Sequence, residues 1–290
     1  LPPIVVKGKH TSIPIMMVQG EQNSEGIHLQ EPQYTLPLVG RSAEMATIEA
    51  QIAATQQEKG RVIQIIGDPG MGKSRLVAEI IQRTSQVGFN GLAGAGQSTT
   101  TQTAYYAWQP IWRSFFRLSA TPQPDELPQL QKALSDLNPT LLATMPLLGP
   151  LLAIPCPDNE TTRNMDAKQR KESLEQLLVN CLQAYAANNT TPLLFVVEDA
   201  HWLDTLSLDL LHVICAAIEK LPMLLVVTQR PNFANTNASL QALPNAIRLT
   251  LNELSANESQ QLIAYKLAIS FGSAHTLPQT LADTIIARAE

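Results

Sequence analysis

The chain has 290 residues, of which 44% are hydrophobic, and a net charge of −5 from 20 Lys+Arg against 25 Asp+Glu. A chain of this length can bury a sizeable core, and its acidic balance argues against a broad basic surface for nucleic acid or an anionic membrane. No apolar run has the length of a membrane span, and the first residues lack the layout of a signal peptide. The three cysteines are scattered without a CxxC pair, which favours packed thiols in a reducing, cytoplasmic compartment.

Residues 1–36 differ in composition from the rest, because they are rich in proline and contain short β-like pieces at 4–6 and 13–18. The opening string LPPIVVKGK, followed by IPI, resembles the closing strands of class III adenylate or guanylate cyclase catalytic domains. The resemblance implies that residues 1–20 end such a domain, that 21–36 form a linker, and that the cyclase active site lies before residue 1. An unrelated β-hairpin followed by a linker is the alternative interpretation.

The segment Leu38-Val39-Gly40-Arg41 stands before a predicted helix, for which Ser42 is the expected N-cap. Apolar residues recur at helical spacing on one face of that helix, at Met45, Ile48 and Ile52. The position of the segment, directly before the strand and loop described next, favours a role in nucleotide binding. An ordinary helix entry with a solvated arginine is the alternative.

The most informative stretch is residues 61–76. Apolar, β-branched residues predict a buried strand over 62–66, and a helix-forming segment begins at Lys73. The loop between them, GDPGMGKS, fits the phosphate-loop pattern GxxxxGK[ST] at every fixed position. Its glycines allow backbone N–H groups to point at an anion, while Lys73 reaches the β- and γ-phosphates and Ser74 places its hydroxyl on Mg²⁺. The predicted contacts to ATP or ADP are Gly67, Asp68, Pro69, Gly70, Met71, Gly72, Lys73, Ser74 and Arg75.

A second strand is expected at 89–96, although its glycines weaken the pattern, and no comparable strand follows between 98 and 189. This long segment is therefore predicted to be a largely helical insertion. Its aromatic residues at helical spacing are more typical of a core than of a base-stacking surface: Tyr105, Tyr106, Trp108, Trp112 and Phe115. A basic cluster on a helix start (Arg163, Lys168, Arg170, Lys171) favours a solvated face, with a phosphate-sensing Arg170 as the alternative.

The apolar run 193–197 predicts a strand covered on both faces, and it ends in Glu198-Asp199. This is the Walker B form, in which one carboxylate faces the phosphate-loop hydroxyl and holds Mg²⁺, and a second orients the attacking water. Glu198 and Asp199 are the predicted metal-binding and, with Lys73, catalytic residues. P-loop enzymes mostly carry Asp first and Glu second, so the reversed order leaves the division of roles open and makes slow hydrolysis an expectation.

The string FVVEDAHWLDTLSLDLL closely resembles the EDxHWxD signature of STAND-type regulatory ATPases, including those attached to class III cyclases and LuxR-type regulators. The segment 38–41 likewise resembles the adenine-side motif of AAA+ and STAND-type P-loop ATPases. This implies that Val39 and Gly40 pack on the base and that Arg41 braces the nucleotide pocket. His201 is either a catalytic base or phosphate sensor, or a packed structural residue, and a histidine beside a tryptophan is more often the latter.

Residues 223–230 predict another buried strand with a polar tip, before a loop that Pro231 starts. In the resembling family this is the sensor strand, whose terminal polar residues lie near the γ-phosphate. The matching residues are Thr228 and Arg230, and the resemblance implies that Arg230 distinguishes ATP from ADP by a charge-assisted bond. An exposed strand-end arginine is the alternative.

A fifth strand is expected at 247–251, and Ser255 with Glu258 forms a capping box that opens a helix. Together the elements predict an α/β P-loop NTPase fold: a five-stranded, mostly parallel sheet flanked by helices, with a helical insertion and a C-terminal helical segment. The expected divisions are an ATPase domain at 37–254 and the start of a lid domain at 255–290. The chain begins without Met and stops inside a helical pattern, so we expect a piece of a longer protein.

The resemblance implies an ATP-binding, slowly hydrolysing switch in a multidomain signalling protein. Its expected partners are an attached effector, most readily a class III cyclase, and C-terminal sensor domains, with nucleotide-dependent self-association as a further option. No nucleic acid or membrane partner is expected for this fragment. A ring-forming AAA+ remodelling ATPase and a P-loop phosphotransferase are the alternatives.

Overall fold

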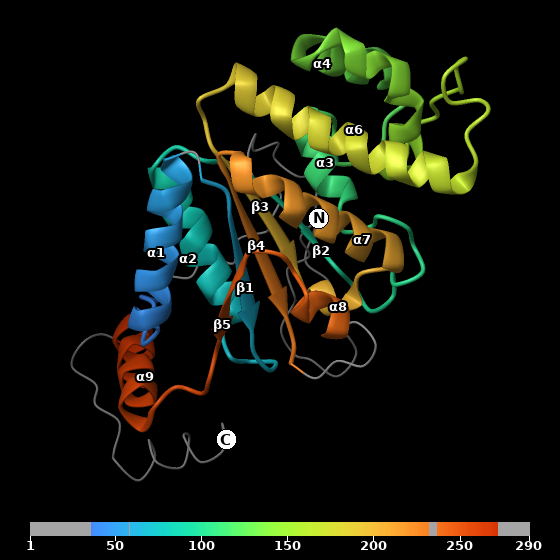
Figure 1. The fold of residues 1–290 in the computed structure, drawn as a ribbon. Helices are drawn as coiled ribbons and strands as arrows, with labels where there is room; N and C mark the ends of the chain where they lie inside the picture. Colours follow the sequence, from blue (N-terminus) through green and yellow to red (C-terminus); the bar gives the residue numbers. More distant parts are fainter. Residues whose placement is uncertain (1–35, 58, 232–236, 272–290) are drawn as a thin grey trace, which may run out of the picture.

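The computed structural model describes residues 36–57, 59–231 and 237–271 (Figure 1). The resemblance to cyclase strands at residues 1–20 and the linker expected at 21–35 lie outside the described residues, as does the last predicted helix at 278–290.

A five-stranded sheet forms the centre of the described chain, in the order β2-β3-β4-β1-β5. All of its neighbouring strands run parallel, which confirms the expected α/β class. Ile63 and Val196 both lie opposite Val226, so the register carries apolar side chains across the middle of the sheet. The strands are β1 (Arg61–Ile66), β2 (Asn90–Ala95), β3 (Leu193–Glu198), β4 (Met223–Gln229) and β5 (Ala246–Thr250).

Helices cover both faces of this sheet, as continuous apolar strands require. Helices α1 (Ser42–Gln56) and α2 (Lys73–Gln86) pack on the face that carries Ile63 and Ile65, and α3, α6 and α7 pack on the other (Figure 1). The remaining helices are α3 (Gln109–Phe115), α4 (Leu127–Leu137), α5 (Leu148–Leu152), α6 (Ala167–Asn188), α7 (Thr205–Ala217), α8 (Asn237–Gln241) and α9 (Ala256–Phe271). Short 3-10 helices are η1 (Pro139–Leu147), η2 (Ala200–Trp202) and η3 (Ile218–Lys220).

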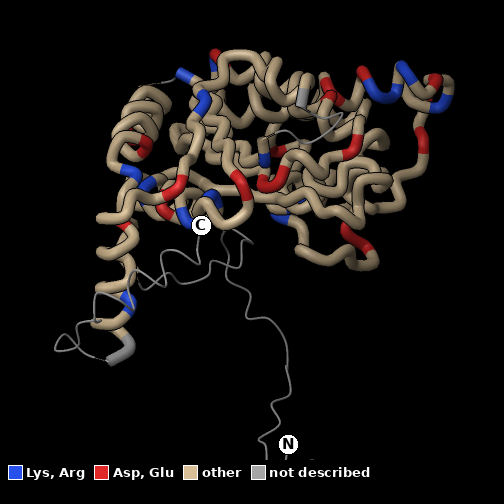
Figure 2. Tube along the Cα trace, turned by 90° about the horizontal axis from the view of Figure 1, so that it is seen from below, with Lys and Arg blue, Asp and Glu red and all other residues tan. Residues whose placement is uncertain are grey.

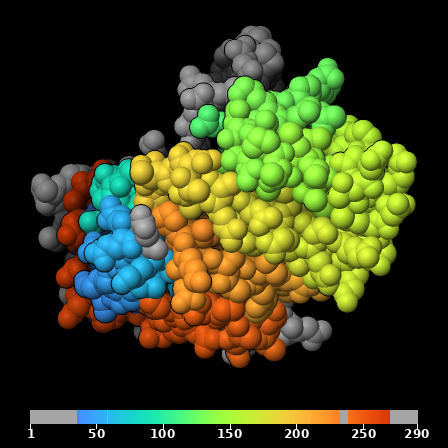
Figure 3. Space-filling view, turned by 45° about the horizontal axis from the view of Figure 1, so that its top comes forward, coloured from blue at the N-terminus to red at the C-terminus, as the bar shows by residue number. Residues whose placement is uncertain are grey.

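The segment between β2 and β3 contains helices α3 to α6, and their green and yellow surfaces gather at one end of the molecule in Figure 3. Its aromatic residues form core, as expected, because Trp108 and Trp112 are fully buried. Trp112 meets Phe195 of β3 edge to face, with ring centroids 5.9 Å apart. Stacking on nucleic acid bases is thus not available to these rings.

The basic cluster at the start of α6 is engaged in ion pairs at the surface. Arg170 donates to Asp158 at 2.7 Å and to the Thr162 carbonyl at 2.9 Å. This pairing lowers the pKa of Asp158, first through the hydrogen bond from Arg170. The solvated-face interpretation therefore describes Arg170 better than phosphate sensing does.

Helix starts follow the expected chemistry, with one correction. Asp204 caps α7 by accepting from the Ser207 N–H, and Ser255 and Glu258 form the expected capping box before α9. The N-cap of α1, however, is Arg41 and not Ser42, which is already helical. The reason is backbone geometry: Arg41 has φ 64°, and its carbonyl accepts the N–H of Met45 at 2.8 Å without any side-chain cap.

Figure 2 shows basic and acidic residues interspersed along the described trace. Within the described residues, no helix is both long and apolar enough to cross a membrane.

Candidate nucleotide-binding site

The predicted motifs meet at one edge of the sheet. Strand β4 pairs with both β1 and β3, so the segments that follow these strands lie side by side at their carboxyl ends (Figure 1). The phosphate loop follows β1, Glu198 ends β3 with Asp199 directly after it, and Thr228 lies near the end of β4 with Arg230 directly after that strand. In parallel α/β sheets this edge is where ligands bind.

The phosphate loop has the backbone conformation that its glycines predict. Gly70 and Gly72 have φ values of 86° and 84°, which an L side chain adopts only with strain. Space is not the constraint, because a Cβ added at either glycine would meet nothing within 4 Å. The loop is anchored to the sheet by the Gly67 N–H, which donates to the Gln229 carbonyl at 3.2 Å.

Helix α2 begins at Lys73, as predicted, and its N-terminus faces the loop. The Lys73 ammonium is largely buried and donates to the carbonyls of Gly67 at 2.8 Å and Asp68 at 3.0 Å. Burial lowers the pKa of Lys73, and the charge of Arg230 acts in the same direction, whereas Asp199 opposes the shift. A bound phosphate would supply the negative charge that this buried cation lacks.

Two of the predicted magnesium ligands, Ser74 and Glu198, come together from helix α2 and strand β3. The Ser74 hydroxyl donates to Glu198 Oε2 at 3.0 Å, joining the first turn of α2 to the end of β3. Burial raises the pKa of Glu198, and the hydrogen bond from Ser74 offsets part of this rise. Of the two acidic residues, Glu198 is the one that faces the phosphate-loop hydroxyl.

Asp199 is held differently, through its backbone. It has φ 50°, and its N–H donates to the Thr228 hydroxyl at 3.0 Å. Its carboxylate is about half exposed, at 45%, and lies 3.9 Å from His201 Nδ1. Thr228, which was predicted beside the γ-phosphate, thus positions the turn that carries the second carboxylate.

His201 and Arg230 also belong to this edge of the sheet. His201 is 3% exposed and packs against Trp202 with ring centroids 5.1 Å apart. Burial lowers the pKa of His201, and the charges of Arg230 and Lys73 lower it further. Arg230 therefore lies near enough to Lys73 and His201 for its charge to act on both.

Arg41 lies behind the phosphate loop and contacts protein groups. Its guanidinium donates to the carbonyls of Met71 at 3.2 Å and Asn252 at 2.5 Å, and pairs with Glu44 at 3.2 Å. Gly40, with φ 66°, is packed closely against the Glu258 side chain, while Val39 is buried. No residue pattern indicates these contacts, because Met71 and Asn252 contribute only backbone carbonyls.

Asp204 makes another long-range contact that the sequence did not indicate. Besides capping α7, its carboxylate accepts the N–H of Tyr105 at 3.1 Å, across 99 positions of the chain. The Trp108 indole also donates to the Ser207 carbonyl at 3.0 Å. The last aspartate of the EDxHWxD string therefore ties the loop after β2 to the start of α7.

The residues present fit a magnesium nucleotide. One hydroxyl and one facing carboxylate suffice for Mg²⁺, which completes its six ligands with water and phosphate oxygens. The donor set therefore suits a metal that arrives with the nucleotide.

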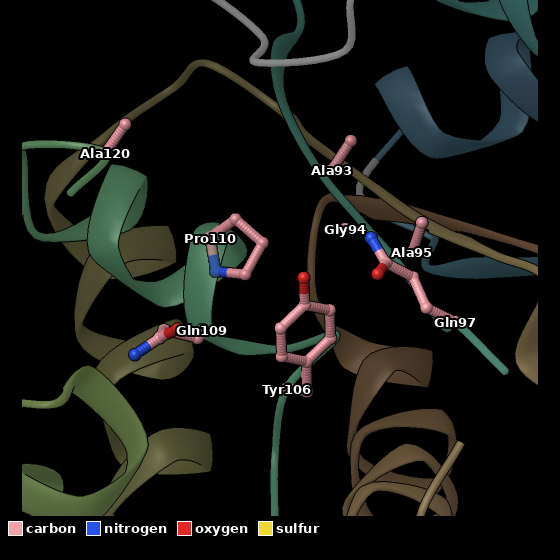
Figure 4. A pocket seen from close by; sticks show the side chains of 8 residues that line it. All are labelled: Ala93, Gly94, Ala95, Gln97, Tyr106, Gln109, Pro110 and Ala120. Carbon is pink, nitrogen blue, oxygen red and sulfur yellow. The ribbon is translucent and has the colours of Figure 1, made fainter. Parts of the chain in front are cut away.

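A separate pocket of about 280 Å³ lies beside the edge strand β2 (Figure 4). Tyr106, Gln109 and Pro110 face the backbone of Ala93 to Ala95 across it. Two strands, β3 and β4, separate β2 from the phosphate-loop strand. This pocket is not part of the nucleotide site.

Comparison with known proteins agrees with the geometry. Residues 37–227 match the family model described as "AAA ATPase domain". An uncharacterized protein of Rhizobium meliloti (strain 1021) is 29% identical over an alignment of 243 residues that covers 79% of this chain and 22% of that protein. The chain thus spans about a fifth of the length of this curated relative.

Solved structures show a similar fold at low identity. A chain in the structure of Drosophila ORC bound to DNA is 13% identical with a TM-score of 0.52, over 96% of this chain and 60% of that one. The Aeropyrum pernix ORC1 protein in complex with DNA is 14% identical with a TM-score of 0.49, over 89% and 58% of the two chains.

Proposed function

This chain belongs to the AAA ATPase domain family, and from that premise we propose that it is an ATP-binding, slowly hydrolysing switch module of a larger signalling protein. The observation that carries the proposal is the 3.0 Å contact between Ser74 of the phosphate loop and Glu198 at the end of β3. It joins the two motifs that a magnesium nucleotide requires on one surface.

We assign the two carboxylates different roles. Glu198, together with Ser74, would hold Mg²⁺, which when bound neutralises charge on the β- and γ-phosphates. Asp199 would orient the attacking water, since its carboxylate is half exposed and its charge acts on Lys73. The left-handed backbone of Asp199 fixes the direction of its carboxylate only while Thr228 accepts its N–H.

Arg230 is the proposed reader of the third phosphate. Its charge lowers the pKa of Lys73, so the two cations lie in the same electrostatic neighbourhood. A γ-phosphate between them would relieve this repulsion, and ADP would relieve it less. ATP is therefore expected to favour one arrangement of the end of β4 and ADP another.

The output of the switch is proposed from the resemblances in the sequence. Residues 1–20 resemble the end of a class III cyclase domain, and the EDxHWxD string resembles STAND-type regulators. We therefore propose an ATPase domain at 37–254, a lid beginning at 255, an attached cyclase as effector, a cytoplasmic location, and sensor domains after residue 290.

The main alternative is a ring-forming AAA+ remodelling ATPase. It predicts fast turnover that rises with protein concentration, because a neighbouring subunit must complete each site. A phosphotransferase would instead require an acceptor-binding lid, and no segment resembles one. The acidic net charge gives no support to nucleic acid binding by this chain, although the ORC proteins in the similar structures are bound to DNA.

The test compares ATP and ADP affinity and turnover for wild type, Lys73→Ala and Arg230→Ala. We expect Lys73→Ala to abolish ATP binding and Arg230→Ala to weaken ATP binding more than ADP binding. Intact ATP binding by Lys73→Ala would overturn the site. An equal effect of Arg230→Ala on both nucleotides would remove its sensor role, and turnover that increases with concentration would favour the ring ATPase.

A further inference from the structure

Three chain segments, one of them the phosphate loop, meet at the side chain of Arg41. The first is the turn at Gly40-Arg41, the second is the loop itself at Met71, and the third is the connection from β5 to α9 at Asn252. The guanidinium of Arg41 bridges the other two, because its Nη2 donates to both carbonyls. Its side chain is only 10% exposed, and its bond to Met71 is partly buried, whereas its bond to Asn252 lies at the surface.

Close packing reinforces this bridge on both sides. A Cβ added to Gly67 would lie 3.2 Å from Leu251 Cβ, and the Leu251 N–H donates to the Ile66 carbonyl at 2.7 Å. A Cβ on Gly40 would lie 2.7 Å from Glu258 Oε1. Glu258 in turn accepts the N–H of Ser255 at 2.7 Å in the capping box of α9. The start of α9 is thereby packed against the turn, and Leu251, which lies between β5 and α9, is packed against the loop.

The chemistry of the bridge makes it sensitive to movement. A guanidinium is planar and presents its N–H donors in fixed directions, so one nitrogen can bond two carbonyls only in a narrow range of positions. A shift of Met71 relative to Asn252 would therefore break at least one charge-assisted bond. Met71 lies between Gly70 and Gly72, in the part of the loop that would close around phosphates.

We propose that Arg41 is a positioning residue that couples the phosphate loop to the start of α9. Nucleotide in the loop and the position of α9 then bias each other through the Met71–Arg41–Asn252 bridge, and this coupling is reciprocal. The inference rests on the proposed nucleotide binding. It gives Arg41 a different role from a direct ligand of the adenine, because its donors are directed to backbone carbonyls and Glu44.

The experiment measures amide hydrogen exchange along the whole 290-residue chain, without nucleotide and with MgADP. Wild type is compared with Arg41→Ala and with Arg83→Ala, which is the control. Arg41→Lys is a milder variant, because it keeps the positive charge but not the planar guanidinium. Arg83 pairs with Glu49 and Glu79 on the surface of α1 and α2, away from the bridge. Circular dichroism shows whether each variant is folded.

Without nucleotide, we expect exchange at 252–258 to be about tenfold faster in Arg41→Ala than in wild type, and unchanged in Arg83→Ala. With MgADP, wild type should gain protection at both 67–74 and 252–258. The Arg41→Ala variant should gain protection at 67–74 but not at 252–258. Arg41→Lys should retain part of the protection at 252–258.

Two results would overturn the coupling. In the first, residues 252–258 of the Arg41→Ala variant gain the same protection from exchange on binding MgADP as those of wild type. In the second, Arg41→Ala loses nucleotide binding while its exchange at 252–258 without nucleotide matches wild type, which would make Arg41 a direct ligand. If wild type gains no protection at 67–74, the proposed nucleotide binding fails instead, and the comparison without nucleotide still decides whether Arg41 holds α9.

Discussion

The N–H of Asp199 donates to the hydroxyl of Thr228 at 3.0 Å, which links the turn after β3 to the end of β4. Thr228 is 1% exposed, so the acceptor of this bond is buried, and the bond itself is partly buried. Asp199 has φ 50°, an uncommon conformation for a residue with a side chain, and the bond that its N–H donates to Thr228 helps to hold it. The strand that was expected to read the γ-phosphate thus also positions a carboxylate of the site.

We predict that Thr228→Val lowers ATP turnover by about tenfold while changing ATP and ADP affinity by less than about threefold. Valine has the shape of threonine but cannot accept the Asp199 N–H, and a buried unpaired donor costs about 1–3 kcal/mol. Steady-state turnover and equilibrium titration measure the two effects. Thr228→Ser keeps the hydroxyl and serves as control. A selective loss of ATP affinity in Thr228→Val would instead indicate direct contact with the third phosphate.

Magnesium dependence should separate the two acidic residues. Chelation of Mg²⁺ by EDTA is expected to weaken ATP binding by wild type and by Asp199→Asn, but to have little effect on Ser74→Ala and Glu198→Gln. The reason is that Ser74 and Glu198 face each other at 3.0 Å, whereas Asp199 is held to Thr228. Fluorescence titration with and without EDTA measures the effect. The roles would be reversed if Glu198→Gln kept the dependence and Asp199→Asn lost it.

A buried ion pair should dominate the stability of the helical segment between β2 and β3. Arg113 Nη2 lies 2.6 Å from both Glu126 oxygens, and the two side chains are 1% and 4% exposed. Removing one partner leaves the other as an unpaired buried charge. Glu126→Gln or Arg113→Met should therefore lower the free energy of unfolding by about 3–5 kcal/mol. Urea denaturation followed by tryptophan fluorescence measures this change.

The double variant Arg113→Met/Glu126→Leu should lose less than the sum of the single changes, because no charge remains unpaired. The exposed pair Lys132–Asp136 offers a control, and Lys132→Ala should change the free energy of unfolding by less than about 1 kcal/mol. Equal effects at both pairs would contradict the importance of burial.

The cysteines should differ in reactivity. Burial raises the pKa of the Cys181 and Cys215 thiols to about 12, so neither forms thiolate near neutral pH, whereas Cys156 is only partly buried. A thiol reagent is expected to modify Cys156 alone in the folded chain and all three cysteines after unfolding. Cys156→Ser should remove the reaction of the folded state. Prompt modification of Cys181 or Cys215 would contradict their packing.

The sequence by itself determined the class of the fold and the chemistry of the loop. Continuous apolar runs such as 193–197 identify buried parallel strands, and GDPGMGKS requires the positive φ values that Gly70 and Gly72 adopt. Strand periodicity and turn chemistry are local properties, so they can be read without knowledge of packing. The strand-to-helix context of the loop and the capping box of Ser255 and Glu258 followed from the same local rules.

Only the tertiary structure decided which residues of the site meet. The sequence left the roles of Glu198 and Asp199 open. The structure selects Glu198 as the partner of Ser74, because β4 lies between β3 and β1 and pairs with both in a fixed register. The Arg41 contacts are likewise long-range, since the carbonyls of Met71 and Asn252 lie 30 and 211 positions from Arg41. Backbone carbonyls carry no residue signature, so long-range bonds to them appear only when the chain is folded.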